Sequence, residues 1–264
     1  MRHNTRPHSK SAAVGAVRWH WLLSIAGLLL LALAAAGLMR GDIRLPDRYN
    51  PWAPLDVYET PGFLTRFKME RALASPTACL AALGQTRMKY DVLPDRTTGP
   101  GCGFDNAVLL RSGPVRLQPA PALSCPMAVS FYMWERHVLQ PAATRHLNQR
   151  VVALEHLGSY ACRNINRGRS SGAMGDADMT NRSRHATANA LDIAAFSLAD
   201  GERVSIARDW PSGQPAPALT PVGRFLREAH QGGCAMFRGV LGPEYNAAHK
   251  DHFHLETGGF RVCR

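Results

Sequence analysis

One long apolar run constrains this chain more than any other sequence feature. Residues Trp21 to Met39 are nineteen consecutive positions without a charged side chain. As an α-helix with a rise of about 1.5 Å per residue, the run would be roughly 28 Å long, close to the roughly 30 Å of a bilayer's hydrocarbon. No second run of this kind occurs in the 264 residues. A polytopic membrane protein is therefore excluded, and the remaining length is enough for one globular domain.

The charges before this run predict its orientation. Residues 1–20 contain four basic residues and no acid, so the positive-inside rule places this basic tail in the cytoplasm and everything after the run across the membrane. The small residues Ala34 to Gly37 offer a cleavage site, although the run is longer than the apolar part of most signal peptides. We expect residues 21–39 to be either a signal anchor or a signal peptide.

Net charge gives a weaker hint about partners. The chain carries 31 Lys or Arg and 20 Asp or Glu, a formal net charge of +11. Six of these basic residues and one acid lie in residues 1–44, so nearly half of the net charge belongs to the export segment and its flanks. The other arginines are dispersed, and no basic stripe with interleaved aromatic residues occurs. We therefore expect no nucleic-acid partner.

The cysteines report on the compartment. All six follow the apolar run, and an even number of exported cysteines favours disulfides in an oxidising compartment. The closest pairs are 23 residues apart and no C-x-x-C motif occurs, which argues against a zinc site made of cysteines. Among the possible pairings we favour Cys234 with Cys263, which would tie the C-terminus to a preceding helix.

Helical signals come early in the exported part of the chain. Residues 40–62 are rich in proline and polar residues, and predict a linker or an extended wrap on the surface of a domain spanning residues 63–264. Ser75, followed directly by proline, predicts a helix start. A second helix is expected from Ser124, with a kink or restart at Pro141.

Strand signals gather in the second half of the chain. Thr220 and Pro221 open one more helical pattern, which we expect to end at Gly232 and Gly233. Helices that come early and strands that come late favour an α+β fold, with helices packed on a small antiparallel sheet, over alternating βαβ units. The expected strands are residues 107–111, 151–157, 159–163, 190–196 and 252–256.

Two segments bring together residue types that can bind a metal. His185 and Asp192 lie in SRHATANALDI, and they are seven positions apart, so they cannot share one face of a strand. They converge only if His185 sits in a loop before the strand that presents Asp192. His252 and His254, in HKDHFHLE, are two apart in an expected strand and would point to the same side.

Two interpretations of these residues are open. A catalytic zinc site needs about three nitrogen or oxygen ligands and one open position, which these side chains could supply. Alternatively, Asp192 is costly to bury in the apolar stretch ALDIA and pairs with an upstream arginine, while the histidines are exposed.

Three motifs in order carry a family resemblance. GSYACR, then S-R-H-A-x-x-N-A-L-D-I, then GPEYNAAHKDHFHLE before a terminal C-R, resemble the extensin-like protein C-terminal domain family of bacteria over roughly Cys79 to Arg264. These motifs in turn resemble the zinc peptidase group of D-Ala-D-Ala carboxypeptidases, penicillin-insensitive murein endopeptidases and the hedgehog signalling domain. The resemblance implies a disulfide-stabilised, hedgehog- or DD-peptidase-like zinc fold.

The resemblance also implies a ligand set and a base. His185 and Asp192 match the group's H-x(6)-D pair of zinc ligands, and His254 matches the final ligand. Asp251, three positions before His254, matches the general base. If the strand includes Asp251, however, its side chain points away from His254, so the base role requires a strand that starts later or passes to His252 or His249.

Further residues are expected around the substrate. Arg163 resembles an upstream arginine that steadies the substrate carbonyl and its developing negative charge. Ser183 falls where the group often has a serine near the substrate, and His249 is expected close to it.

The sequence leads to three candidate functions. The resemblance implies a zinc-dependent peptidase or amidase that acts on peptidoglycan peptides, on the periplasmic side of the bacterial inner membrane or, if cleaved, free in the periplasm. If the N-terminal segment is not cleaved, its helix contacts the inner membrane. The second possibility is a non-catalytic, zinc-containing module that binds the cell wall. A nucleic-acid binder is the third, and export argues against it.

Overall fold

The computed structural model describes residues 12–40, 45–165, 181–215 and 218–264. The chain divides into two compact units, residues 1–50 and 51–264.

The first unit contains helix α1 (Ala12–Arg40) and a short 3-10 helix, η1 (Asp47–Tyr49). Large apolar side chains described on α1, such as Leu28 and Leu31, are about two-thirds exposed. Within the described ranges, no helix combines the length and the apolarity needed to cross a membrane. The anchor role of residues 21–39 stays a prediction, and more than half of the expected basic tail lies outside the described residues.

A seven-stranded sheet organises the second unit. The strands follow the order β12-β10-β11-β8-β7-β5, and β9 pairs with β8 beside this path. Neighbours are antiparallel except at β10–β12 and β5–β7, which are parallel. The strands are β5 (Arg116–Leu117), β7 (Val151–Gly158), β8 (Ala190–Leu198), β9 (Arg203–Ser205), β10 (Gly239–Leu241), β11 (Phe253–Glu256) and β12 (Val262–Cys263).

Two smaller antiparallel sheets accompany it. One has the order β1-β4-β6, and the other is a hairpin of β2 and β3. Their strands are β1 (Lys89–Val92), β2 (Arg96–Gly99), β3 (Cys102–Phe104), β4 (Ala107–Ser112) and β6 (Ala122–Ser124). Mixed helix and sheet with mainly antiparallel pairing confirms the expected α+β class.

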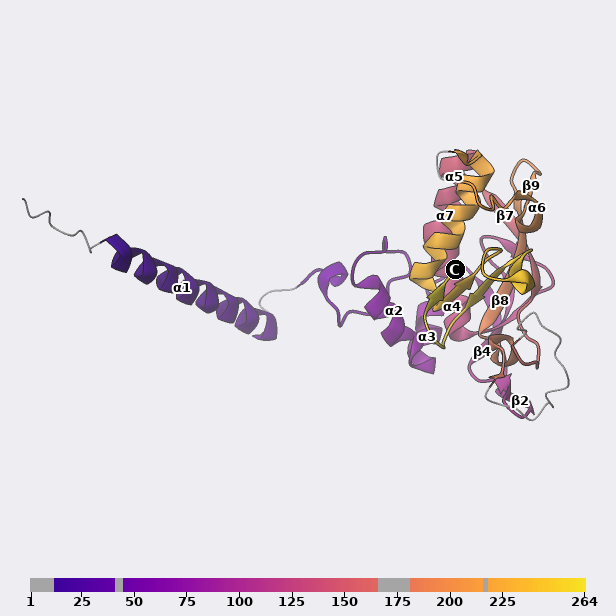
Figure 1. Ribbon diagram of the computed structural model, residues 1–264. Coiled ribbons are helices and arrows are strands. Elements are labelled where there is room, and N and C mark those ends of the chain that lie inside the picture. Colours follow the sequence, from indigo (N-terminus) through magenta and orange to yellow (C-terminus); the bar gives the residue numbers. More distant parts are fainter. Residues whose placement is uncertain (1–11, 41–44, 166–180, 216–217) are drawn as a thin grey trace, which may run out of the picture. The chain divides into compact units, whose positions relative to one another are not determined.

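Helices α4 (Cys125–Trp134), α5 (Gln140–Leu147) and α7 (Pro221–Met236) lie along one side of strands β7 and β8 (Figure 1). Trp134 and Phe225 are fully buried and pack around Phe196 of β8, and Trp134 Nε1 donates a hydrogen bond to Ala229 O at 2.9 Å. The helical segments are α2 (Thr65–Leu73), α3 (Pro76–Gly84), α4 (Cys125–Trp134), a π-helical turn η2 (Glu135–Leu139), α5 (Gln140–Leu147), η4 (Arg184–Thr187), α6 (Ile206–Asp209), α7 (Pro221–Met236) and η6 (Ala247–His249).

The helix starts follow local capping chemistry. Ser75, Ser124 and Thr220 each accept a hydrogen bond from a backbone N–H in the first turn, and a proline follows within the first two helical positions. The expected starts of α3, α4 and α7 are therefore confirmed. The restart at Pro141 is confirmed too, because α4 passes through η2 into α5 at this point.

The expected end of α7 is wrong. The helix continues through Gly232 and Gly233 to Met236. A Cβ atom at Gly232 would clash with Val138 Cγ1 of η2, and one at Gly233 would contact Val240 and Trp134. The two glycines allow α7 to pack closely against its neighbours, and they do not terminate it.

The strand expected at residues 159–163 is also absent. This segment is irregular, and its one isolated bridge joins the following Asn164 to Arg182. Ala161 N donates to His185 O at 3.1 Å, and Ser183 N donates to Arg163 O at 3.1 Å. These backbone hydrogen bonds join the segment to the turn η4 and to the residue before it. They hold that turn in position, and they do not form the ladder of a β-sheet.

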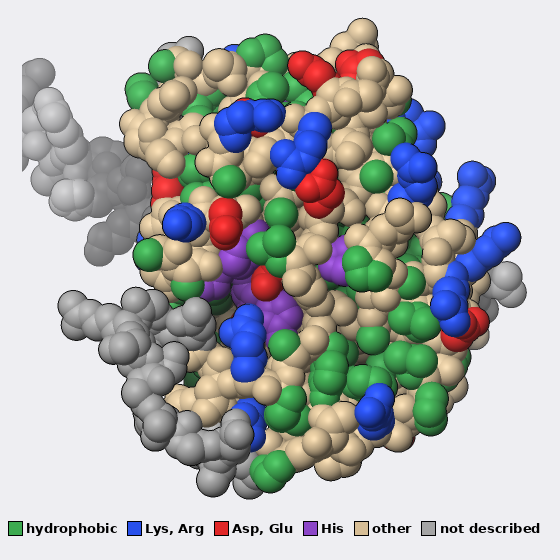
Figure 2. Space-filling model, turned by 90° about the vertical axis from the view of Figure 1, so that its right-hand side faces the viewer, with side chains coloured by type: hydrophobic (Ala, Val, Ile, Leu, Met, Phe, Trp, Pro, Cys, Tyr) green, Lys and Arg blue, Asp and Glu red, His purple; other side chains and the backbone are tan. Residues whose placement is uncertain are grey.

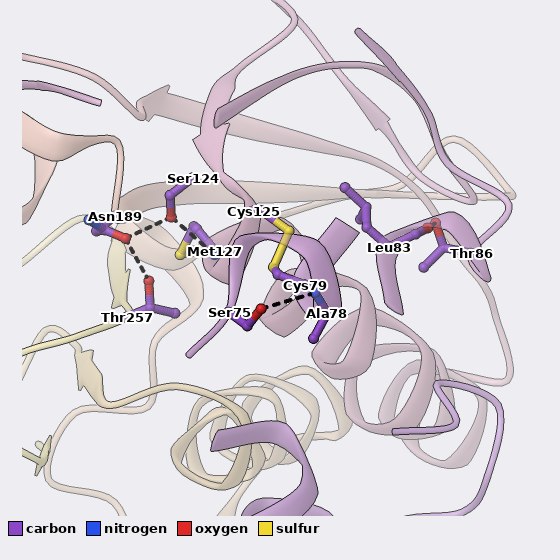
Figure 3. Close-up of a disulfide and its surroundings, with 10 residues drawn as sticks. All are labelled: Ser75, Ala78, Cys79, Leu83, Thr86, Ser124, Cys125, Met127, Asn189 and Thr257. Atoms are coloured by element: carbon purple, nitrogen blue, oxygen red, sulfur yellow. Dashed lines mark hydrogen bonds between the residues drawn. A yellow bond between two sulfur atoms is a disulfide. The ribbon is translucent and has the colours of Figure 1, made fainter. Parts of the chain in front are cut away.

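Three disulfides join the elements: Cys79–Cys125, Cys102–Cys162 and Cys234–Cys263. The favoured pairing of Cys234 with Cys263 is confirmed. Cys79–Cys125 links α3 to the start of α4 (Figure 3). Within residues 51–62, Leu55 and Val57 are buried in the core. This part of the chain therefore packs on the domain, as expected for an extended wrap and not for a free linker.

Candidate metal centre

Strand register and a tight turn bring three side chains together. His185 lies in η4, where Ser183 Oγ accepts a hydrogen bond from His185 N at 3.4 Å. Ala188 adopts a left-handed conformation (φ 53°) directly after this turn, and β8 then starts at Ala190. Asp192 is directly opposite His254 in the antiparallel pair of β8 and β11, so both side chains share one face of the sheet.

The three side chains form a compact cluster. The ligand atoms of His185, Asp192 and His254 all lie within 4.8 Å of one another. His185 Nε2 lies 3.1 Å from Asp192 Oδ2, and His254 Nδ1 lies 2.7 Å from Asp192 Oδ1. The two facing ring nitrogens are 3.3 Å apart. Two imidazole nitrogens and one carboxylate are a donor set that fits zinc with an open fourth position.

The second nitrogen of each imidazole also has a partner. His185 Nδ1 donates to Ser159 O at 3.3 Å, and His254 Nε2 donates to Glu256 Oε2 at 3.0 Å. Such contacts orient a histidine and leave its other nitrogen free for a metal. Sequence reasoning missed Glu256, although its position two residues after His254 in a strand places it on the same face.

Burial and the contacts between Asp192 and its histidine neighbours shift the pKa values of Asp192 and His254. Burial raises the pKa of Asp192, but hydrogen bonds and charges from His185 and His254 outweigh burial and hold that pKa well below its usual range. Burial lowers the pKa of His254, whereas Asp192 and Glu256 raise it, with a net pKa of about 9. A metal would therefore compete with a proton on His254.

His252 and Asp251 extend the cluster. Strand β11 begins at Phe253, so Asp251 lies on the preceding turn, and its side chain is half exposed. His252 Nδ1 donates to Asp251 Oδ1 at 2.9 Å, and its Nε2 faces Asp192 Oδ1 at 3.6 Å. The structure thus brings His252 to the cluster directly and Asp251 through His252.

The expected substrate residues line the same cleft. The ring of His249 meets the His254 ring edge to face, with 5.6 Å between the ring centres, and its Nδ1 lies 2.8 Å from Asn246 Oδ1. Burial, followed by the neighbouring His254 and His252, lowers the pKa of His249 to about 4. Ser183 is buried, and Asn246, which caps η6, is a residue that sequence reasoning missed.

The cleft above the cluster has a volume of about 720 Å³. Arg163, Arg182 and Arg184 line it together with the exposed ring of Phe260. Histidine side chains gather at the bottom of a hollow on this face, with basic and acidic side chains beside them (Figure 2). The cleft therefore combines a candidate metal centre with positive charge for an anionic ligand.

Comparison with known proteins places the chain in a family. A family model described as "Extensin-like protein C-terminus" matches residues 77–264. The chain belongs to this extensin-like family. The matched region of this extensin-like protein contains His185, Asp192 and His254 as well as all six cysteines. No curated protein and no solved structure matches it. The wider relationship to the zinc peptidase group stays a prediction.

Proposed function

We propose that this extensin-like protein is a zinc-dependent peptidase or amidase that acts on peptidoglycan peptides in the cell envelope. The observation that carries the proposal is the convergence of His185, Asp192 and His254 at a cleft of about 720 Å³. The H-x(6)-D and D-x-x-H pattern supports a hedgehog- or DD-peptidase-like zinc site. The three disulfides support an oxidising compartment such as the periplasm.

The three proposed ligands supply the first part of the proposed chemistry, which is a bound Lewis acid. His185 Nε2, His254 Nδ1 and Asp192 would hold the ion, with Ser159 and Glu256 fixing the two imidazoles. Bound zinc supplies a Lewis acid that polarises an amide carbonyl and lowers the pKa of water to about 7.

The neighbouring residues supply proton transfer and charge stabilisation. Asp251 holds the Nδ1–H of His252, which leaves Nε2 facing the cluster as a proton acceptor. The contacts therefore favour His252 as the base and Asp251 as its positioning partner. Arg163 would stabilise negative charge that develops on the substrate oxygen, while Ser183 and His249 contact the substrate beside it.

The N-terminal helix gives the proposed location. We propose that α1 either anchors the protein in the inner membrane, with the catalytic unit on the periplasmic side, or directs export before cleavage. The basic residues before the apolar run and the disulfides after it support the same direction of transfer.

Digestion of purified sacculi tests the proposed activity. The zinc-loaded full-length protein should release muropeptide fragments that the His254→Ala and His252→Ala variants and an EDTA-treated sample do not release. The Glu228→Gln variant is the matched control, because Glu228 binds His146 away from the cleft. Identical muropeptide profiles for wild type and His254→Ala would refute the peptidase. Bound zinc and tight binding to sacculi without cleavage would favour the non-catalytic wall-binding module.

A further inference from the structure

A second cavity of about 380 Å³ lies between α2, α4 and the segment that follows β11. We call it the α2–α4 cavity. Among the described residues, it shares only Gly259 with the histidine cleft. Its volume is at the lower end of the range for small-molecule sites. Nothing in the proposed peptidase chemistry uses it.

One residue of the cavity wall carries an unpaired hydroxyl. Ser130 of α4 is fully buried, and its Oγ has no hydrogen-bond partner among the described residues. The neighbouring polar side chains satisfy one another, because Asn189 Oδ1 accepts hydrogen bonds from Ser124 Oγ at 2.6 Å and Thr257 Oγ1 at 3.2 Å (Figure 3). A buried hydroxyl without a partner costs free energy. Ser130 is therefore the polar group that a ligand could satisfy.

The mouth of the cavity carries one net positive charge. Arg66 Nε and Arg238 Nη1 donate to the same oxygen, Glu70 Oε1, at 3.3 Å and 3.2 Å. Arg238 Nη2 also donates to Gly259 O at 3.5 Å. Two guanidinium groups that share one carboxylate leave charge and donors for a second carboxylate, which arginine binds with a planar, two-pronged geometry.

Apolar side chains connect the mouth and the interior. Met69, Met236 and Phe237 are buried against the core and line the cavity together with Leu73. The cavity therefore has three zones: a positively charged mouth, an apolar wall, and a single buried hydroxyl.

We propose that the α2–α4 cavity binds a small peptide-like carboxylate. The carboxylate contacts Arg66 and Arg238, an apolar side chain packs on Met69 and Phe237, and an amide group forms a hydrogen bond with Ser130 Oγ. This ligand class satisfies the three zones at once. A purely apolar ligand would leave Ser130 and the charge at the mouth without partners.

N-acetyl-leucine is a suitable probe because it combines a carboxylate, an apolar side chain and an amide. The full-length protein labelled with ¹³C at the methionine methyl groups reports directly on the cavity through Met69 and Met236. Their resonances should shift saturably, with a Kd on the order of 1 mM for a ligand of this size. The resonance of Met88, which does not line the cavity, should stay in place and show that the shifts are local to the cavity.

Variants and a matched ligand separate the three zones. Arg238→Gln should weaken binding about fivefold or more, because it removes a charge-assisted contact, and Arg203→Gln, which breaks the remote pair with Glu155, should not. Ser130→Ala should also weaken binding. N-acetyl-leucinamide, which has no carboxylate, should bind at least fivefold more weakly. Absence of a saturable shift, or equal affinities across these variants and ligands, would overturn the proposal.

Discussion

Replacing Glu256 with glutamine should weaken zinc binding about tenfold. Glu256 Oε2 accepts the Nε2–H of His254 at 3.0 Å, and the two side chains are only 16% and 9% exposed. A hydrogen bond to a charged acceptor contributes about 1.5–3 kcal/mol and one to a neutral acceptor about 0.5–1.5 kcal/mol. Glutamine retains an acceptor but loses the charge that strengthens this bond when a cation binds Nδ1. Replacing such a partner of a metal-binding histidine lowers metal affinity by about ten- to a hundredfold, and the retained acceptor favours the lower end of that range.

Competition with a chelator of known zinc affinity, at fixed pH, measures this change. Glu228→Gln is the matched control, because Glu228 also accepts a hydrogen bond from a histidine, His146, but outside the cleft. The control should bind zinc as the wild type does. If Glu256→Gln binds zinc within twofold of the wild type, the assignment of Glu256 as the residue that orients His254 is wrong.

Three further predictions concern stability and are measured by denaturant unfolding. Joint replacement of Cys79 and Cys125 by alanine should cost about 4 kcal/mol, because the disulfide closes a loop of 46 residues; an unchanged midpoint would contradict this. Asn189→Ala should cost about 3 kcal/mol, because it leaves Ser124 and Thr257 without their shared acceptor; a loss below about 0.5 kcal/mol would show that water replaces the side chain. Burial raises the pKa of Glu135, so its ionisation destabilises the fold as pH rises through its unfolded-state pKa. The stability of Glu135→Gln relative to wild type should therefore increase from about pH 4 to pH 7, and a pH-independent difference would refute the reasoning.

Local chemistry explains which parts of the fold could be predicted. Ser75 and Ser124 mark helix starts because a cap and the following proline act within one turn, so the signal is contained in a few adjacent residues. The end of α7 depends instead on Val138, which is distant in sequence and packs on Gly232. A glycine that permits close packing and a glycine that ends a helix have the same local sequence signal, so periodicity alone could not separate them.

The candidate site also has parts that local sequence predicts and parts that depend on residues distant in sequence. Strand periodicity predicted that His252 and His254 face one side, and both side chains lie at the cluster. The approach of Asp192 to His254 depends on the register of β8 against β11, which joins positions 62 residues apart. No local pattern determines that register, and the prediction of this triad came from family resemblance. Glu256 was missed although it ends the motif GPEYNAAHKDHFHLE, because the ligand pattern of the zinc peptidase group gives that position no role.

The disulfide between Cys234 and Cys263 has a consequence for the order of assembly. It closes a loop of 29 residues that contains β10, β11 and the segment with His252 and His254. Before the bond forms, this segment is held by strand pairing and packing alone, and the entropy of the open loop works against it. Oxidation and completion of the cluster therefore favour each other. If the cluster binds zinc as proposed, a chain that is still reduced should capture the metal less readily than the oxidised chain.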